Sequence, residues 1–295
     1  MLHPLRSLSR YLVFPVMLCL GIFSTLALIN QGSAPMTAFG IVSILFSLGV
    51  LLLEQVLPHR ADWQVRDHQE WQDIGHNILG TAVGASIGKA LSETLFIGAG
   101  LWLATQFEHG FWPTHWPFVL QVVLVFLLAD LGRYVQHRLL HRYDLLWRFH
   151  VLHHSVDKLY VLKNARSHIV ERITQPVFMF GLLFLMGVPP EVLFWYIMPN
   201  SFLGIFDHSN VDARLGPLSY IINGPAEHRL HHSRDPDDSQ HNFGSALVFW
   251  DMVFGTYKNP RPHYSPEQVG IEGDTTPQNF WGQVWEPFKL PASQK

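Results

Sequence analysis

The chain has 295 residues, of which 48% are hydrophobic and only 15% are charged. Soluble domains carry roughly a quarter charged residues, so this composition indicates a protein partly embedded in lipid. The formal net charge of −3 argues against nucleic acid as a partner, because nucleic-acid binding requires a basic surface. The single cysteine, Cys19, excludes both a disulfide framework and a cysteine-based zinc site, whereas the 18 histidines are unusually many.

Two apolar segments near the N-terminus are each long enough to cross a membrane, for which a helix needs about 20 residues. The first, 11–29, follows Arg6 and Arg10 and contains no charge. The second, 36–57, contains only Glu54. A signal peptide would begin in a similar way, but the length of the first run and the second span close behind it favour a membrane anchor.

Two further apolar segments predict a third and a fourth span. Segment 76–106 is rich in Gly and Ala, and it contains Lys89 and Glu93, which at i and i+4 can pair on one helix face. Segment 116–131 begins the fourth span and continues without a helix breaker into Arg133. We therefore expect a third helix that is either long and tilted or broken at a glycine, followed by a fourth helix that extends beyond the membrane.

Basic residues gather on one side of these spans, whereas the opposite loops, 30–35 and 107–115, contain none. The flanking basic positions are Arg6, Arg10, Arg60, Arg66, Arg133, Arg138, Arg142 and Arg148. Because cytoplasmic loops of membrane proteins carry an excess of Lys and Arg, we expect the N-terminus and everything after about residue 132 in the cytoplasm.

Segment 174–206 is apolar again, but the sequence Gly-Val-Pro-Pro at 187–190 divides it. Each half is short for a crossing, so we expect a hairpin that dips into the bilayer and returns. A single crossing here would place the histidines before and after it on opposite sides of the membrane. The predicted fold is therefore an all-α integral membrane protein with about four transmembrane helices, a membrane-dipping hairpin and a cytoplasmic helical cap that carries the histidines.

The histidines form three groups with regular spacing. His137 and His141 are four residues apart, and the strings HVLHHSVD at 150–157 and HRLHHSRD at 228–235 are near-copies of each other. Residues three or four apart share a helix face, so each string can offer two nitrogens to one ion and a third to a neighbouring ion. One short helix cannot surround a metal, so several groups must meet. Imidazole suits Zn, Cu, Fe and Ni, so the ligand type alone does not select the metal.

The order of these motifs resembles that of the fatty acid hydroxylase and sterol desaturase superfamily of membrane di-iron proteins. The match covers about 117–258 and closes with the string WDMVFGT at 250–256. It includes RSHIVE at 166–171, where Ile169 stands in place of the family's proline. Within the superfamily the chain looks closest to the alkylglycerol monooxygenase and bacterial sterol-desaturase-like branch.

The resemblance implies which residues form the site. His168 departs most from the family's pattern, and His241 is left out because the family tolerates other residues there. The expected metal ligands are His137, His141, His150, His153, His154, His168, His208, His228, His231 and His232. The corresponding regions are an N-terminal transmembrane region with three spans at 1–116, a catalytic domain at 117–258 and a polar tail at 259–295.

Three polar residues are candidates to support these ligands. Asp130 precedes His137 by seven residues and therefore shares its helix face, so its carboxylate can accept a hydrogen bond from a ligand's free N–H and fix the tautomer. The alternative is a charge at a helix end on the membrane boundary. Glu171 lies three residues after His168, and Asn242 follows the last histidine string.

The reaction that the resemblance implies is activation of O2 at two irons followed by attack on a C–H bond of a lipid. Hydroxylation is favoured, with desaturation as the alternative on the same site. The sequence contains no haem-binding or flavin motif, so we expect a separate electron-donor protein (ferredoxin-, flavodoxin- or cytochrome b5-like with a reductase) that docks near the basic residues of 138–148.

Two other classes of function, a membrane zinc hydrolase and a non-enzymatic metal transporter, are the alternatives. A membrane zinc hydrolase would need a glutamate base beside the ligands, as in HExxH, and this motif is absent. A metal transporter would place His or Asp along a pathway through the spans, which are almost free of them.

Overall fold

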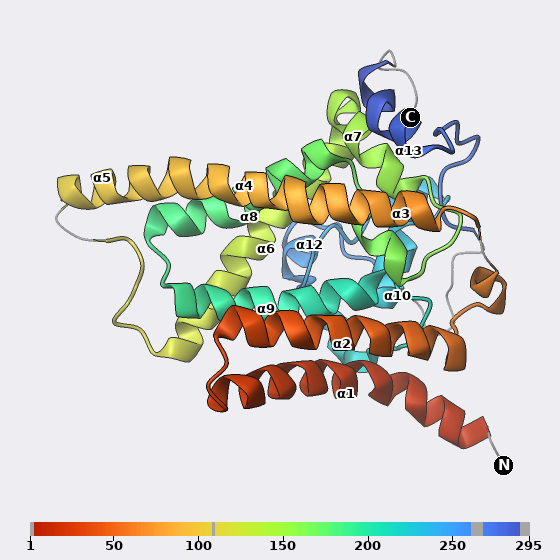
Figure 1. Ribbon diagram of the computed structural model, residues 1–295, viewed down its shortest axis with the longest axis horizontal. Helices are drawn as coiled ribbons and strands as arrows, with labels where there is room; N and C mark the ends of the chain where they lie inside the picture. The colour runs from red at the N-terminus through yellow and green to blue at the C-terminus, as the bar shows by residue number, and fades with distance from the viewer. Residues whose placement is uncertain (1–2, 66, 108–109, 261–267, 290–295) are drawn as a thin grey trace.

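The computed structural model describes residues 3–65, 67–107, 110–260 and 268–289. In this part of the chain the regular elements are helices and short helical turns, together with three isolated β-bridges. The all-α fold is therefore confirmed. Most of the long helices run side by side along one direction, and the short elements after residue 207 gather at one end of the bundle (Figure 1).

The N-terminal helices α1 (His3–Asn30) and α2 (Pro35–Val56) form an antiparallel pair. Every fourth residue of α2, from Ala38 to Glu54, is buried, because this face packs against α1 and α9. Glu54 is the one acidic residue of α2, and its carboxylate accepts hydrogen bonds from the backbone N–H groups of Val161 and Asn210. Glu54, the charged residue in the second predicted span, thus connects α2 to residues in the C-terminal half of the chain.

A long helical rod follows, and it contains the segment predicted as the third span. It consists of α3 (Glu70–His76), a π-helical segment η2 (Asn77–Gly84), α4 (Ala85–Ser92), a second π-helical segment η3 (Glu93–Ile97) and α5 (Gly98–Phe107). At 1.5 Å per residue the rod is about 55 Å long, which exceeds the ~30 Å hydrocarbon thickness of a bilayer. The π-helical turns, and not a glycine break, interrupt its α-helical hydrogen bonding.

The rest of the bundle is α6 (Phe118–Arg142), α8 (Ile169–Met186) and α9 (Pro190–Asp207). Glycines let α8 approach its neighbours closely: a Cβ on Gly88 of α4 or on Gly132 of α6 would overlap the carbonyl groups of Ile173 and Phe178, respectively. Such backbone contact is typical of helix packing in membranes. The glycine-rich part of the third span therefore serves packing.

The predicted hairpin is confirmed in its path. Gly187 takes a left-handed conformation (φ 78°), and Val188 N–H donates to the Leu183 carbonyl at 3.0 Å, which ends α8 and turns the chain into α9. Residues before α8 and after α9 therefore lie at the same end of the bundle (Figure 1).

Four helices in the described residues are long and apolar enough to cross a membrane: 8–30, 35–56, 118–142 and 169–186. One of the four differs from the prediction. Helix α8 is long and apolar enough to be a span, whereas the rod, which contains the predicted third span, is divided into shorter helices by its π-helical turns. The sequence pattern cannot reveal such turns, since they change the hydrogen bonding without changing the composition.

Short elements complete the end of the bundle that carries the histidines. They are α7 (Asp144–His154), α10 (Pro225–His231), α11 (Pro236–Ser239), α12 (Phe249–Val253) and α13 (Phe280–Trp285), with 3-10 turns η1 (Ala61–Gln64), η4 (Val161–Ala165), η5 (Gly216–Tyr220) and η6 (Glu286–Phe288). The segment predicted as a polar tail is thus partly helical. Its Gln283 is buried and lies 3.0 Å from the ring of His76 in α3.

Candidate metal centre

Nine of the ten predicted histidine ligands meet at one place. They come from the end of α6, from α7, from the end of α9 and from α10, and none is more than 7% exposed. Their ring nitrogens form two groups, in each of which the atoms lie within 4.8 Å of one another. The first group is His137, His141, His150, His154 and His231, and the second is His153, His208, His228 and His232.

The two near-identical strings are divided between the groups in a complementary way. From the first string, His150 and His154 enter the first group and His153 enters the second. From the second string, His228 and His232 enter the second group and His231 enters the first. Each string therefore gives its i and i+4 rings to one group and its middle ring to the other, which ties the two groups together.

Hydrogen bonds fix the tautomers of two rings in the first group. The Nδ1 atoms of His137 and His231 donate to the carbonyls of Phe243 (3.0 Å) and His241 (2.8 Å), which can only accept. In a neutral ring the Nε2 atom then carries a lone pair. Even so, Nε2 of His137 lies 3.0 Å from Nε2 of His150 and 3.0 Å from Nε2 of His231. Lone pairs that face one another this closely repel unless a cation lies between them.

The ring nitrogens of the second group are spaced as closely. His153 donates its Nδ1–H to the Arg166 carbonyl at 3.2 Å, and its Nε2 lies 3.2 Å from Nε2 of His208. The Nε2 atoms of His208, His228 and His232 follow one another at 3.1 Å. Neighbouring ligands at right angles on an ion, with metal–nitrogen bonds of about 2.1 Å, would be about 3.0 Å apart, so the spacing fits a metal.

Burial also holds the rings in the form that binds metal. It lowers the pKa of His153, His154, His228 and His232 well below the usual value, and that of His231 to about 3. A ligand imidazole must be neutral, so these rings do not need to lose a proton near pH 7. The nitrogen donor set, its spacing and its protonation state all suit two transition-metal ions.

Glu171 contacts the first group directly. Its Oε2 accepts the Nδ1–H of His150 at 3.0 Å, and its Oε1 lies 3.7 Å from the Arg133 guanidinium. The sequence analysis paired Glu171 with His168, three residues before it, but in the structure its carboxylate contacts His150 instead. A carboxylate bonded to the far nitrogen of a ligand fixes the ring's orientation and raises its basicity.

Asp130 is buried beside the same centre but touches none of the histidines. Its carboxylate accepts hydrogen bonds from the Tyr196 hydroxyl (3.1 Å) and from the N–H groups of Ala246 (3.1 Å) and Leu247 (2.6 Å). These bonds hold the loop whose Phe243 carbonyl accepts from His137. Asp130 thus acts on a ligand through the loop, not by the direct bond that the helix face suggested.

Asp251 is a supporting residue that the sequence analysis did not single out. It accepts hydrogen bonds from Phe243 N–H at 2.8 Å and Gly244 N–H at 2.7 Å, and it is fully buried. The only sequence signal is its position in the WDMVFGT string, where an acid between aromatic residues must find partners if it is buried.

Asn242 occupies the turn next to this loop. It has a left-handed backbone (φ 58°), and its side chain accepts from Lys258 N–H at 2.9 Å and donates to the Lys258 carbonyl at 2.9 Å. Its side chain therefore braces two chain segments and does not face the histidine groups. The adjacent His241 supplies the carbonyl that accepts from His231.

His168 is the predicted ligand that the structure places apart from both groups. Its Nδ1 accepts from Val170 N–H at 3.2 Å, which caps α8, and its Nε2 donates to the Val284 carbonyl at 3.0 Å. We expect His168→Ala to retain the full metal content and to lower the free energy of unfolding by about 1 kcal/mol through loss of the cap. Metal analysis and thermal unfolding of the variant test this, and a loss of metal would return His168 to the ligand set.

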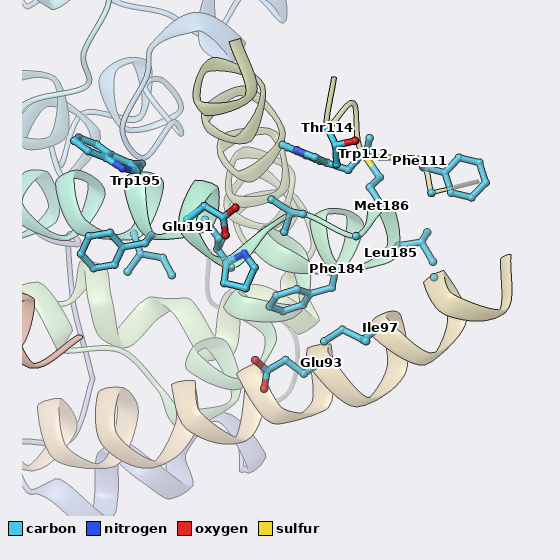
Figure 2. A pocket seen from close by; sticks show the side chains of 18 of the residues that line it. Glu93, Ile97, Phe111, Trp112, Thr114, Phe184, Leu185, Met186, Glu191 and Trp195 are labelled. Carbon is cyan, nitrogen blue, oxygen red and sulfur yellow. The ribbon is translucent and has the colours of Figure 1, made fainter. Parts of the chain in front are cut away.

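A cavity of about 1580 Å³ lies at the opposite end of the bundle. Figure 2 shows its walls, with Phe184 at the hairpin tip, Trp112 before α6, and Glu93 on the rod. The last cavity residue of α9 is Ile197, so the cavity is about 16 Å along that helix from His208. It is apolar and lies among the long helices, but it is not the chamber that holds the histidines.

Comparison with known proteins agrees with this geometry. The model of the fatty acid hydroxylase family matches residues 122–256. Ornithine lipid hydroxylase OlsE of Rhizobium tropici is 34% identical over 94% of this chain and 83% of its own length. Alkylglycerol monooxygenase of Xenopus tropicalis is 31% identical over 71% of this chain, and sphingolipid C4-hydroxylase sur2 of Schizosaccharomyces pombe is 28% identical over 48%. The chain spans about half the length of these last two relatives, 45% and 49%, and no solved structure matches it. The chain belongs to the fatty acid hydroxylase family.

Proposed function

We propose that the protein is a membrane-bound, O2-dependent di-iron oxygenase that hydroxylates a C–H bond of a lipid. The observation that supports this proposal most is the pair of buried histidine groups, whose closely spaced ring nitrogens could each hold a metal ion. The relatives' names, all of lipid hydroxylases or monooxygenases, give the reaction class. Two irons bound there would supply the reductive activation of O2.

The chain's own residues prepare the site in three ways. The nine imidazoles present neutral Nε2 atoms to two positions, and Glu171 and the Phe243 carbonyl fix the rings of His150 and His137. Asp130 and Asp251 hold the loop that carries this carbonyl. Burial of every ligand excludes water, which protects a strongly oxidising centre from side reactions.

The lipid substrate would enter from the membrane. The apolar cavity and the long helices give room for acyl chains, and each buried methylene contributes about 0.8 kcal/mol to binding. Because a relative that matches 94% of this chain is an ornithine lipid hydroxylase, a lipid with an amino-acid head group is the first substrate to test. Ether lipids are the second, after the alkylglycerol monooxygenase.

The distribution of Lys and Arg supports a multi-pass protein whose histidine end faces the cytoplasm. Hydroxylation consumes two electrons and two protons for each O2, with one oxygen atom entering the lipid and the other leaving as water. A ferredoxin-, flavodoxin- or cytochrome b5-like donor would supply these electrons from the cytoplasm, docking near the basic residues of 138–148.

The proposal is tested with the iron-loaded protein in vesicles that contain an ornithine lipid, with a reducing system and isotopically heavy O2. We expect a product heavier by one labelled oxygen atom. A product that has lost two hydrogens and gained no oxygen would identify a desaturase instead. Turnover that continues with zinc and without O2 would overturn oxygenation in favour of hydrolysis.

A further inference from the structure

We propose that an aromatic face near the C-terminus rests in the head-group layer of the membrane and holds the metal-bearing helix α7 at that level. The face consists of Trp281, Trp285 and Phe288, which are 66%, 56% and 58% exposed. They lie at i, i+4 and i+7 in α13 and η6, so they point to one side. Clustered exposed aromatic residues mark interaction surfaces, and Trp in particular gathers at membrane–water interfaces.

The aromatic face is attached to the beginning of the rod. Gln72 of α3 donates its side-chain N–H to the Gln278 carbonyl at 2.9 Å, and the ring of Phe280 lies 4.7 Å from that of His76. In Figure 1, α13 lies beside α3 and α7, at the end of the bundle where the rod begins. The face therefore lies at the level of the beginning of the rod.

The rod itself indicates which partner covers the face. Exposed apolar side chains follow one another along it at helical spacing, among them Trp71 (81% exposed), Ile78 (60%), Ile87 (42%) and Leu95 (59%). Such a stripe on a membrane-crossing helix faces lipid. It ends at Trp71, in the first turn of α3, where an interfacial tryptophan is expected. The aromatic face on α13 lies next to this end, so the lipid surface that covers the stripe also reaches the face.

One contact connects the aromatic face to the metal centre, and a second joins its helix to the start of α8. The ring of Phe288 packs against Phe149, which precedes the ligand His150, with the ring centroids 5.6 Å apart. The Val284 carbonyl accepts the hydrogen bond from His168 at the start of α8. Membrane contact of α13 would thus set the height of α7 above the bilayer. The inference rests on the third membrane span that the sequence predicts, which the rod would form, and not on the proposed reaction.

Spin labels at single cysteines test this directly. In a Cys19→Ser background, labels are placed by Trp281→Cys and Trp285→Cys, with Ile87→Cys on the rod and Glu272→Cys in an exposed loop as matched controls. The full-length protein is reconstituted in phosphatidylcholine vesicles, and collisions of each label with O2 and with a water-soluble nickel chelate are measured. We expect the labels at 281 and 285 to collide with the chelate several-fold less than the label at 272, and several-fold more than the label at 87.

Each other outcome overturns the inference in a distinguishable way. If the label at 87 lies in hydrocarbon while those at 281 and 285 match the label at 272, the membrane crossing stands and the aromatic face is in water. If the label at 87 also meets the chelate freely, the proposed crossing of the rod fails as well. If labels 281 and 285 are shielded from both reagents, a second protein copy covers the face in place of lipid.

Discussion

Replacing His154 or His232 by alanine is expected to lower turnover by more than about 100-fold, since even residues that only support a metal ligand cost 10–100-fold. The two rings stack with centroids 4.4 Å apart but belong to different histidine groups. Each substitution should therefore remove a ligand from a different ion. We expect iron to fall from two ions per chain toward one in either variant.

Iron content, measured by metal analysis of purified protein, and lipid turnover check this result. His241→Ala is the matched control, because it removes a partly buried imidazole nearby while keeping the backbone carbonyl that accepts from His231. The control should keep both irons. Full iron and full activity in His154→Ala or His232→Ala would remove that residue from the ligand set and would contradict the division of the histidines into two groups.

Replacing Glu171 by alanine is expected to cost about 10–100-fold in iron affinity or turnover. The substitution leaves the Nδ1–H of His150 and the guanidinium of Arg133 without the carboxylate that lies between them. Glu171→Gln keeps an oxygen acceptor for His150 but removes the charge, so its loss should be smaller.

Iron-binding titrations and turnover of both variants provide the measurement. Glu191→Gln, which removes a carboxylate from the wall of the distant apolar cavity, is the control and should keep normal iron affinity. Equal activity of Glu171→Ala and the unaltered protein would show that the carboxylate does not support the His150 ring.

The helical spacing of the histidines made much of the centre predictable. Because i and i+4 share a face and i+3 lies to one side, each HXXHH string can serve two ions, and the structure distributes the rings in this way. The partners of Asp130 were not predictable, although its helix face was. Two of its hydrogen-bond donors, the N–H groups of Ala246 and Leu247, lie more than a hundred residues along the chain, and the third is the Tyr196 hydroxyl of α9.

Other differences have similar causes. The role of His168 depends on a carbonyl at Val284, which lies in a segment that the sequence indicated only as polar tail. The apolar pattern of the rod located a helix correctly, but the π-helical turns within it are a matter of hydrogen bonding that composition does not encode. Local spacing thus predicts which side chains share a face, whereas long-range contacts decide what that face meets.

The central claim is that imidazoles from distant parts of the chain enclose two metal ions. An anomalous difference map at the iron absorption edge, from crystals of iron-loaded protein, tests it most directly. We predict two peaks, one enclosed by His137, His141, His150, His154 and His231 and the other by His153, His208, His228 and His232. A single peak, or peaks beyond bonding reach of either set, would contradict the account.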